Sequence, residues 1–219
     1  PNIQLGELKL KVSNLQRSLQ FYQEVIGFKV LRKQENHAEL TADGKQVFLV
    51  LEEVKDAVVV PPRSASGLYH IAILLPSRAE LGACLRHLIE SNIEIGQADH
   101  LVSEALYLSD PDHNGIEIYR DRPRESWEWD DAGQVKMATD PIDWQGLLEE
   151  GKRKEWTGLP DNTTLGHVHF HVSDLQKSRK FYCDILGFDV VLDWSQMRAM
   201  FISAGGYHHH IGLNMWAGI

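Results

Sequence analysis

The sequence has few cysteines, a deficit of positive charge and no long apolar run. Its two cysteines, Cys84 and Cys183, fit neither a disulfide framework nor a thiolate zinc site, which indicates a reducing, cytoplasmic environment. The formal net charge of -9 argues against nucleic-acid binding, because the field of the chain repels a polyanion. We find no signal peptide and no apolar segment long enough to span a bilayer, so we expect no membrane association.

Histidine is the residue that stands out in an otherwise ordinary composition. There are 11 histidines, a surplus compatible with a transition-metal site. Three of them are consecutive, His208 to His210, in the string "GGYHHHIGLN" at 205–214. This string lies inside the chain, where a purification tag would not be placed, so its function has to be explained.

An internal repeat organises the chain. Residues 5–28, "LGELKLKVSNLQRSLQFYQEVIGF", align without a gap to 165–188, "LGHVHFHVSDLQKSRKFYCDILGF". Each copy predicts an alternating strand, then a helix that begins at Ser13 or Ser173 as its N-cap and ends at Gly27 or Gly187. Three further strands follow in each copy, so the unit is βαβββ.

A diverged third copy lies between these two. Residues 67–76 predict its first strand, 77–92 its helix, and "IEIGQADH", "EALYLSD" and "GIEIYRD" its other strands. The segment 122–164 is Trp-rich and charged, with a short helix near 143–150, and we expect it to be a connector packed on the outside. The predicted modules are therefore 1–60, 66–121 and 165–219.

These modules predict an α+β fold. A single βαβββ unit leaves one sheet face and one edge uncovered, so such units normally pair. We expect paired, incompletely closed mixed β-sheet barrels with helices outside. Because three is an odd number, we also expect that a fourth, C-terminal module is missing from this sequence.

The repeat aligns candidate metal ligands. Glu7, His70 and His167 occupy the same first-strand position, and Glu117 lies in the last strand of the middle module. If the middle and third modules pair, His70, His167, Glu117 and one histidine of the 208–210 run converge. Two histidines and one carboxylate form a facial triad, which leaves positions on Fe(II) open for a bidentate substrate and dioxygen. Strand alternation predicts that His208 and His210 share a face and that His209 points away.

The strings "GHVHFHVSDLQKSRKFYCDILGF" and "YLSDPDHNGIEIY" resemble the vicinal-oxygen-chelate superfamily of glyoxalases, bleomycin-resistance proteins and extradiol dioxygenases. With "YHHHIGLN" included, the resemblance is nearest to the Bacillus-type catechol 2,3-dioxygenases and covers almost the whole chain. It implies an oxidoreductase that uses non-haem Fe(II) to insert O2 into a small aromatic diol in aromatic-compound degradation. It is also compatible with a homodimer.

The resemblance also implies roles for particular residues. The metal ligands would be His70, His167 and Glu117. Tyr107, ten residues before Glu117, matches a family tyrosine that orients the substrate oxygen, and His100 is the nearest candidate for a substrate-contacting histidine. We assign the proton-transfer role to His210 or His208.

Two other functions remain open at this point. A glyoxalase-type isomerase or lyase would use His210 as a fourth ligand beside His70, Glu117 and His167, with Ni, Zn or Mn in place of Fe. A drug-sequestering binding protein would hold a small molecule without any metal. The number of metal ligands distinguishes the isomerase or lyase from a dioxygenase, because a fourth ligand leaves less room on the metal for O2 and a diol.

Overall fold

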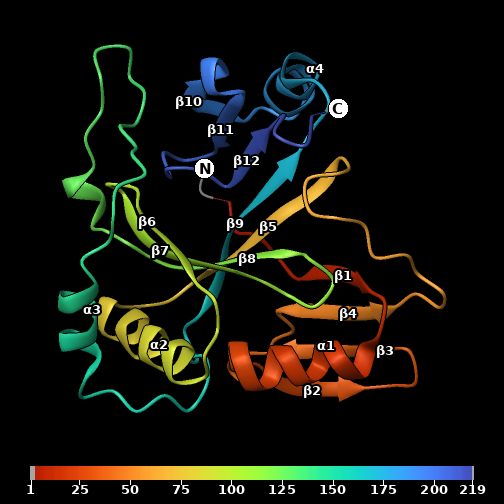
Figure 1. The fold of residues 1–219 in the computed structure, drawn as a ribbon. Coiled ribbons are helices and arrows are strands. Elements are labelled where there is room, and N and C mark those ends of the chain that lie inside the picture. The colour runs from red at the N-terminus through yellow and green to blue at the C-terminus, as the bar shows by residue number, and fades with distance from the viewer. Residues whose placement is uncertain (1–2, 219) are drawn as a thin grey trace.

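The computed structural model describes residues 3–218, and three βαβββ modules follow one another along the chain (Figure 1). The first module forms a four-stranded sheet in the order β1-β4-β3-β2, with its helix on one face. Its elements are β1 (Leu8–Val12), α1 (Leu15–Phe21), the π-helix η1 (Tyr22–Ile26), β2 (Lys29–Lys33), β3 (His37–Thr41) and β4 (Leu49–Glu53).

The other two modules share one sheet. The middle module contains β5 (Gly67–Leu74), α2 (Arg78–Glu90), β6 (Gly96–Asp99), β7 (Ser103–Ser109) and β8 (Gly115–Asp121). The third contains β9 (Thr164–His171), α4 (Leu175–Arg179), the π-helix η3 (Lys180–Ile185), β10 (Asp189–Trp194), the 3-10 turn η4 (Ser195–Met197), β11 (Ala199–Ser203) and β12 (Ile211–Asn214).

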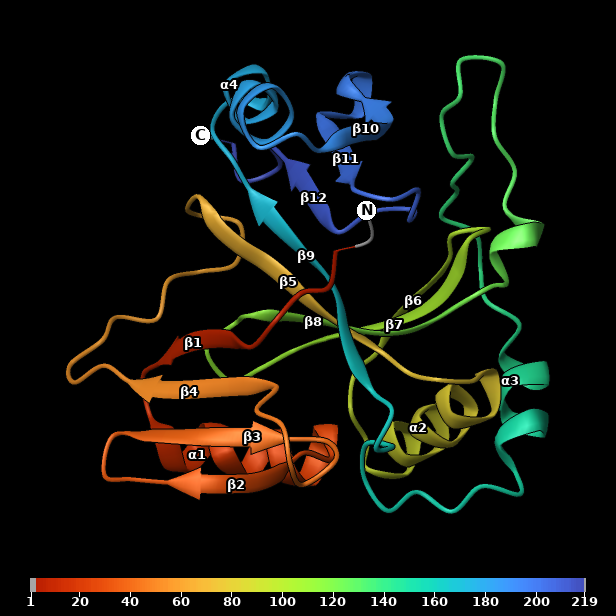
Figure 2. The same ribbon diagram turned by 180° about the vertical axis from the view of Figure 1, so that it is seen from behind.

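Their eight strands run in the order β10-β11-β12-β9-β5-β8-β7-β6. The two first strands, β5 and β9, pair antiparallel at the centre of this sheet, where they cross the middle of the molecule (Figure 2). The α+β class and the paired, open sheet therefore agree with the sequence prediction.

The two aligned helices begin one residue later than predicted. The N-caps are Asn14 and Asp174, whose side chains accept hydrogen bonds from the backbone N–H groups of Arg17 and Lys177. Ser13 instead contacts the middle module, where its hydroxyl donates a hydrogen bond to Asp112 Oδ1 at 2.5 Å. Because Asn, Asp and Ser are nearly equal as N-caps, sequence preference alone does not separate neighbouring candidates.

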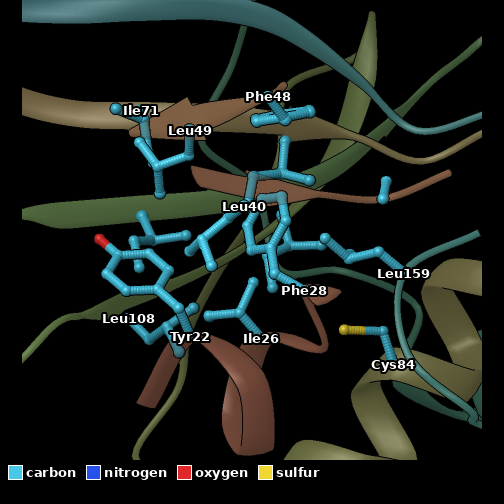
Figure 3. Packing of buried hydrophobic residues seen from close by; sticks show 14 of the residues in the cluster. Tyr22, Ile26, Phe28, Leu40, Phe48, Leu49, Ile71, Cys84, Leu108 and Leu159 are labelled. Atoms are coloured by element: carbon cyan, nitrogen blue, oxygen red, sulfur yellow. The ribbon is translucent and has the colours of Figure 1, made fainter. Parts of the chain in front are cut away.

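The first and middle modules share one hydrophobic core. Tyr22 and Ile26 from η1 pack with Ile71 of β5, Cys84 of α2 and Leu108 of β7 in a single buried cluster (Figure 3). The Tyr22 hydroxyl donates to Asp110 Oδ2 at 3.0 Å, which satisfies its only proton within this apolar surrounding. This shared core holds the first module against the middle one.

The connector is only partly on the outside, which corrects the sequence prediction. Its short helix α3 (Trp144–Gly151) does lie on α2, and so closely that a Cβ on Gly82 would come within 2.0 Å of the Leu147 carbonyl oxygen. The segment after η2 (Arg124–Ser126), however, bridges the two ends of the large sheet. Asp140 pairs with Asp99 of β6, and the N–H of Val135 donates to the Val191 carbonyl of β10 at 2.9 Å.

The bridging segment also contributes a buried tryptophan. Trp127 is buried with Leu192, Phe201 and Tyr207 of the third module. Burying a large aromatic side chain removes much apolar surface from water, and this contact fixes the connector across the open side of the sheet.

Candidate metal centre

Three neighbouring strands position the predicted ligands. Ala72 of β5 lies opposite Glu117 of β8 on one side and opposite His167 of β9 on the other. His70 precedes Ala72 by two residues on the same strand, so it projects to the same face.

The ligand atoms converge on one point. Oε2 of Glu117 lies 3.0 Å from Nε2 of His70 and 3.0 Å from Nε2 of His167, and the two imidazole nitrogens are 3.4 Å apart. Ligands at right angles, each about 2.1 Å from a metal, would be about 3.0 Å apart. All three side chains are buried, and no fourth His, Cys, Asp or Glu from residues 3–218 joins this cluster.

The charges of the cluster favour the ligand forms of these groups. Burial raises the pKa of Glu117, but His167 and His70 outweigh it and hold that pKa well below its usual value. Burial lowers the pKa of His167 to about 4, against the opposing effect of Glu117. Around neutral pH the site therefore offers a carboxylate and a neutral imidazole, the forms that bind a divalent metal. The donor set fits such an ion.

Tyr107 and His100 form a pair beside the triad. Tyr107 of β7 lies opposite Glu117 in the sheet, and its hydroxyl is 2.6 Å from Nε2 of His100. Nδ1 of His100 is 2.7 Å from the carbonyl oxygen of Ala138 in the connector. Since a carbonyl only accepts, Nδ1 donates, and in a neutral His100 Nε2 accepts the proton of Tyr107.

A cavity reaches the triad at His70. Its volume is about 760 Å³, and its lining includes His70, Tyr107 and His171 together with the linker 60–66. Volumes of this order suit small organic ligands. A molecule in the cavity would contact the metal ligand His70 and Tyr107 together.

The consecutive histidines do not lie where strand alternation placed them. His208, His209 and His210 precede β12, in an irregular segment where the two-residue period of a strand does not apply. His209 is the one beside the triad, with its ring centroid 4.1 Å from that of His167. The sequence prediction had turned His209 away from the site and is wrong on this point.

His210 and His208 have other partners. Nδ1 of His210 lies 3.0 Å from the Ser203 hydroxyl and accepts from the N–H of Ala204 at 3.3 Å. His210 lines a second cavity of about 590 Å³, outside the metal cluster, so the structure does not support it as a fourth ligand. Nε2 of His208 is bound to Asp121 Oδ1 at 2.8 Å.

Gly212 also has a role that the sequence did not indicate. The space above its Cα is filled by His169, since a Cβ on Gly212 would lie 2.7 Å from Cγ of this imidazole. His169 accepts a hydrogen bond from Asn214 at 3.0 Å, and His171 lies 2.6 Å from the amide oxygen of the same residue. These two histidines are thus bound into the sheet.

Comparison with known proteins agrees with this fold. The family model described as "Glyoxalase/Bleomycin resistance protein/Dioxygenase superfamily" matches residues 4–118 and 164–215. The chain belongs to this superfamily. It is 59% identical over 214 residues to the catechol-2,3-dioxygenase of Bacillus subtilis strain 168, which covers 98% of this chain and 75% of that protein. Identity at this level classes the chain as a dioxygenase-type enzyme of the superfamily.

Solved structures support the fold alone. A provisionally named dioxygenase from Bacillus subtilis strain 168 superimposes with a TM-score of 0.64 at 14% identity, over 98% of this chain and 64% of that one. A variant of glyoxalase I from Zea mays gives 0.55 at 16% identity, over 96% of this chain and 67% of that one. The chain thus spans about two thirds of the length of both proteins. Among residues 3–218, no helix has the length and apolarity needed to cross a bilayer.

Proposed function

We propose that this protein is an extradiol dioxygenase that inserts O2 into a catechol-like diol with Fe²⁺ held by His70, Glu117 and His167. The observation that carries the proposal is the three-ligand cluster, with His210 engaged elsewhere. Three ligands on one face leave room for both oxygens of a 1,2-diol and for dioxygen. The name and 59% identity of the Bacillus subtilis relative support the same activity.

Bound Fe²⁺ would supply Lewis acidity toward the diol and a site for dioxygen, and the surrounding residues perform the other tasks. Tyr107 orients a substrate oxygen through its hydroxyl. Nε2 of His100 accepts a hydrogen bond from that hydroxyl and fixes its position, because the Ala138 carbonyl holds the proton of His100 on Nδ1.

His209 replaces His210 and His208 as our candidate for proton transfer. Burial and the neighbouring histidines lower the pKa of His209 well below its usual value, so the ring is neutral and able to accept a proton. Its ring lies against the ligand His167, whereas His208 and His210 are bound to Asp121 and to Ser203. His209 therefore takes the phenolic proton of the diol.

The decisive experiment is oxygen uptake by the protein loaded with Fe²⁺ under anaerobic conditions. We expect uptake and a yellow ring-opened product on addition of catechol. Hydroquinone is the matched control substrate, because its oxygens are too far apart to chelate one metal. Iron binding without uptake on catechol or substituted catechols would instead indicate an isomerase, and failure to bind iron would indicate a binding protein.

The expected homodimer stays a prediction. Light scattering coupled to size-exclusion chromatography would test it, with twice the chain mass of 24.9 kDa as the expected result.

A further inference from the structure

A continuous chain of hydrogen bonds begins at the buried His209 and crosses to the half-buried Asp121 at the end of β8. Nδ1 of His209 lies 2.8 Å from Nδ1 of His208, and Nε2 of His208 lies 2.8 Å from Oδ1 of Asp121. The other carboxylate oxygen, Oδ2, accepts from the Tyr207 hydroxyl at 2.9 Å, and that hydroxyl is 2.6 Å from the hydroxyl of Tyr119. The function proposed above uses only His209 from this chain.

The direction of each hydrogen bond follows from the carboxylate. Ionised Asp121 can only accept, so Nε2 of His208 and the Tyr207 hydroxyl both donate to it. A neutral imidazole has one N–H, which means that Nδ1 of His208 is then a bare acceptor. With His208 in this neutral form, the proton between the two histidines sits on Nδ1 of His209.

This assignment determines the chemistry of the other ring nitrogen. With its proton on Nδ1, a neutral His209 has a bare lone pair on Nε2. No side-chain or backbone group among residues 3–218 forms a hydrogen bond with this Nε2. The orientation of the ring is fixed by the bond at Nδ1 and by aromatic contacts with His167, His208 and Phe201. An unprotonated, unoccupied nitrogen is what a proton acceptor requires.

We propose that Asp121 is a positioning residue that acts through His208 to keep Nε2 of His209 unprotonated and ready to accept the substrate proton. The catalytic consequence rests on the proposed dioxygenase function, whereas the tautomer itself does not. Asp121 lies outside the metal cluster. It acts on Nε2 of His209 through the rings of His208 and His209, as the carboxylate of a catalytic triad orients its histidine.

The competing arrangement differs by one proton. If His208 carried protons on both nitrogens, it would donate to Asp121 and to His209 at once, and Nε2 of His209 would hold the proton. If His208 instead held its single proton on Nδ1, its bare Nε2 would face the carboxylate oxygen at 2.8 Å, with no hydrogen between them. Such a pair of facing lone pairs in a buried site is costly.

Nitrogen-15 NMR of histidine-labelled protein tests the tautomer without any turnover. We would use the full chain both metal-free and loaded with diamagnetic Zn²⁺, and assign His209 by the signals lost in His209→Gln. We expect the signal of a bare nitrogen at Nε2 and of a protonated nitrogen at Nδ1. A protonated Nε2 in the wild-type protein would overturn the inference.

Two variants separate the role of Asp121 from general damage to the site. Asp121→Ala removes the acceptor of His208, and we expect protonated Nε2 to appear at His209. Tyr207→Phe is the matched control, because it removes the bond to Oδ2 but leaves the bond between Oδ1 and His208, so the tautomer should not change. An unchanged His209 tautomer in Asp121→Ala would overturn the inference, and the wild-type spectrum remains a test if that variant does not fold.

Kinetics then connect the tautomer to the reaction. In the iron-loaded enzyme, Asp121→Ala should lower kcat about 10- to 100-fold with little change in KM, the range seen when an outer partner of a site histidine is removed. An inactive protein with bare Nε2 would refute the proposed function alone. An active protein with protonated Nε2 would refute this inference alone.

Discussion

The first and third modules share a sequence pattern but differ in what they do. Both begin with the repeat at 5–28 and 165–188, and both fold as βαβββ. The aligned position is an exposed Glu7 in the first module and a buried His167 in the third. The strand β9 pairs with the first strand of another module, whereas β1 pairs with β4 alone among residues 3–218. The module is thus a scaffold, and the candidate metal centre arises where two first strands meet.

The helices of the two modules show the same contrast in packing. Ile26 at the end of η1 is fully buried in the core shared with the middle module, whereas the aligned Leu186 after η3 is 53% exposed. The residues are similar in size and hydrophobicity, so the difference comes from their surroundings. The neighbouring module determines which apolar positions of the repeat contribute to stability.

The largest effect on iron binding and activity is expected at Glu117, the ligand that lies 3.0 Å from both histidines. Glu117→Gln keeps the shape of the side chain but removes the negative charge, so Fe²⁺ should bind at least about 100-fold more weakly and activity at limiting iron should fall in parallel. Titration with Fe²⁺ under anaerobic conditions, followed by oxygen uptake, measures both. Glu104→Gln, a second buried glutamate that pairs with Arg78 outside the cluster, is the control for charge loss.

Neighbouring histidines of the 208–210 run should differ strongly. His209→Gln should lower kcat about 10²- to 10³-fold with iron retained, because general acid–base catalysis contributes in this range. His210→Gln should keep iron and leave kcat within about threefold, since His210 lies outside the cluster. The opposite ranking of the two variants would restore His210 as the proton-transfer residue.

The different burial of Ile26 and Leu186 predicts that alanine substitutions at these two aligned positions change the free energy of unfolding by different amounts. Ile26→Ala should lower the free energy of unfolding by about 2–5 kcal/mol, because it leaves a cavity in a fully buried core. Leu186→Ala should change it by less than about 0.5 kcal/mol, as for other exposed positions. Urea unfolding followed by circular dichroism measures both, and equal losses would show that the third-module helix is also covered in solution.

The smallest effect concerns acid stability. Burial, with smaller contributions from His208 and Arg124, lowers the pKa of His210 from 6.5 to about 4. A histidine with a lowered folded-state pKa binds protons preferentially when unfolded, so it destabilises the fold as the pH falls from about 6.5 to about 4. His210→Gln should make the decline in unfolding free energy between these pH values shallower. An unchanged slope would show that His210 titrates normally.

Much of this arrangement could be predicted from sequence because it depends on repetition and strand period. The gapless repeat gave the βαβββ unit, and the aligned positions of His70 and His167 led to a shared site with Glu117. These inferences work because residues within a strand alternate between faces and because paired modules bring equivalent strands together.

What could not be predicted lies outside regular strands. His209 reaches His167 from an irregular segment, where no period fixes the direction of a side chain. Asp121 contacts His208, and Trp127 of the connector packs on the third module, through contacts between residues far apart in sequence. Such contacts depend on the folded arrangement of all modules, so one sequence carries no local signal for them.

Metal retention in two aligned variants is the most direct test of the central claim that paired first strands build the metal centre. His167→Ala and Glu7→Ala change the same position of the repeat, in the third and first modules respectively. After loading with Fe²⁺ and removal of free metal, we predict about one Fe²⁺ per chain in the wild-type protein and in Glu7→Ala, and almost none in His167→Ala. Full iron content in His167→Ala, or loss of iron in Glu7→Ala, would contradict the account.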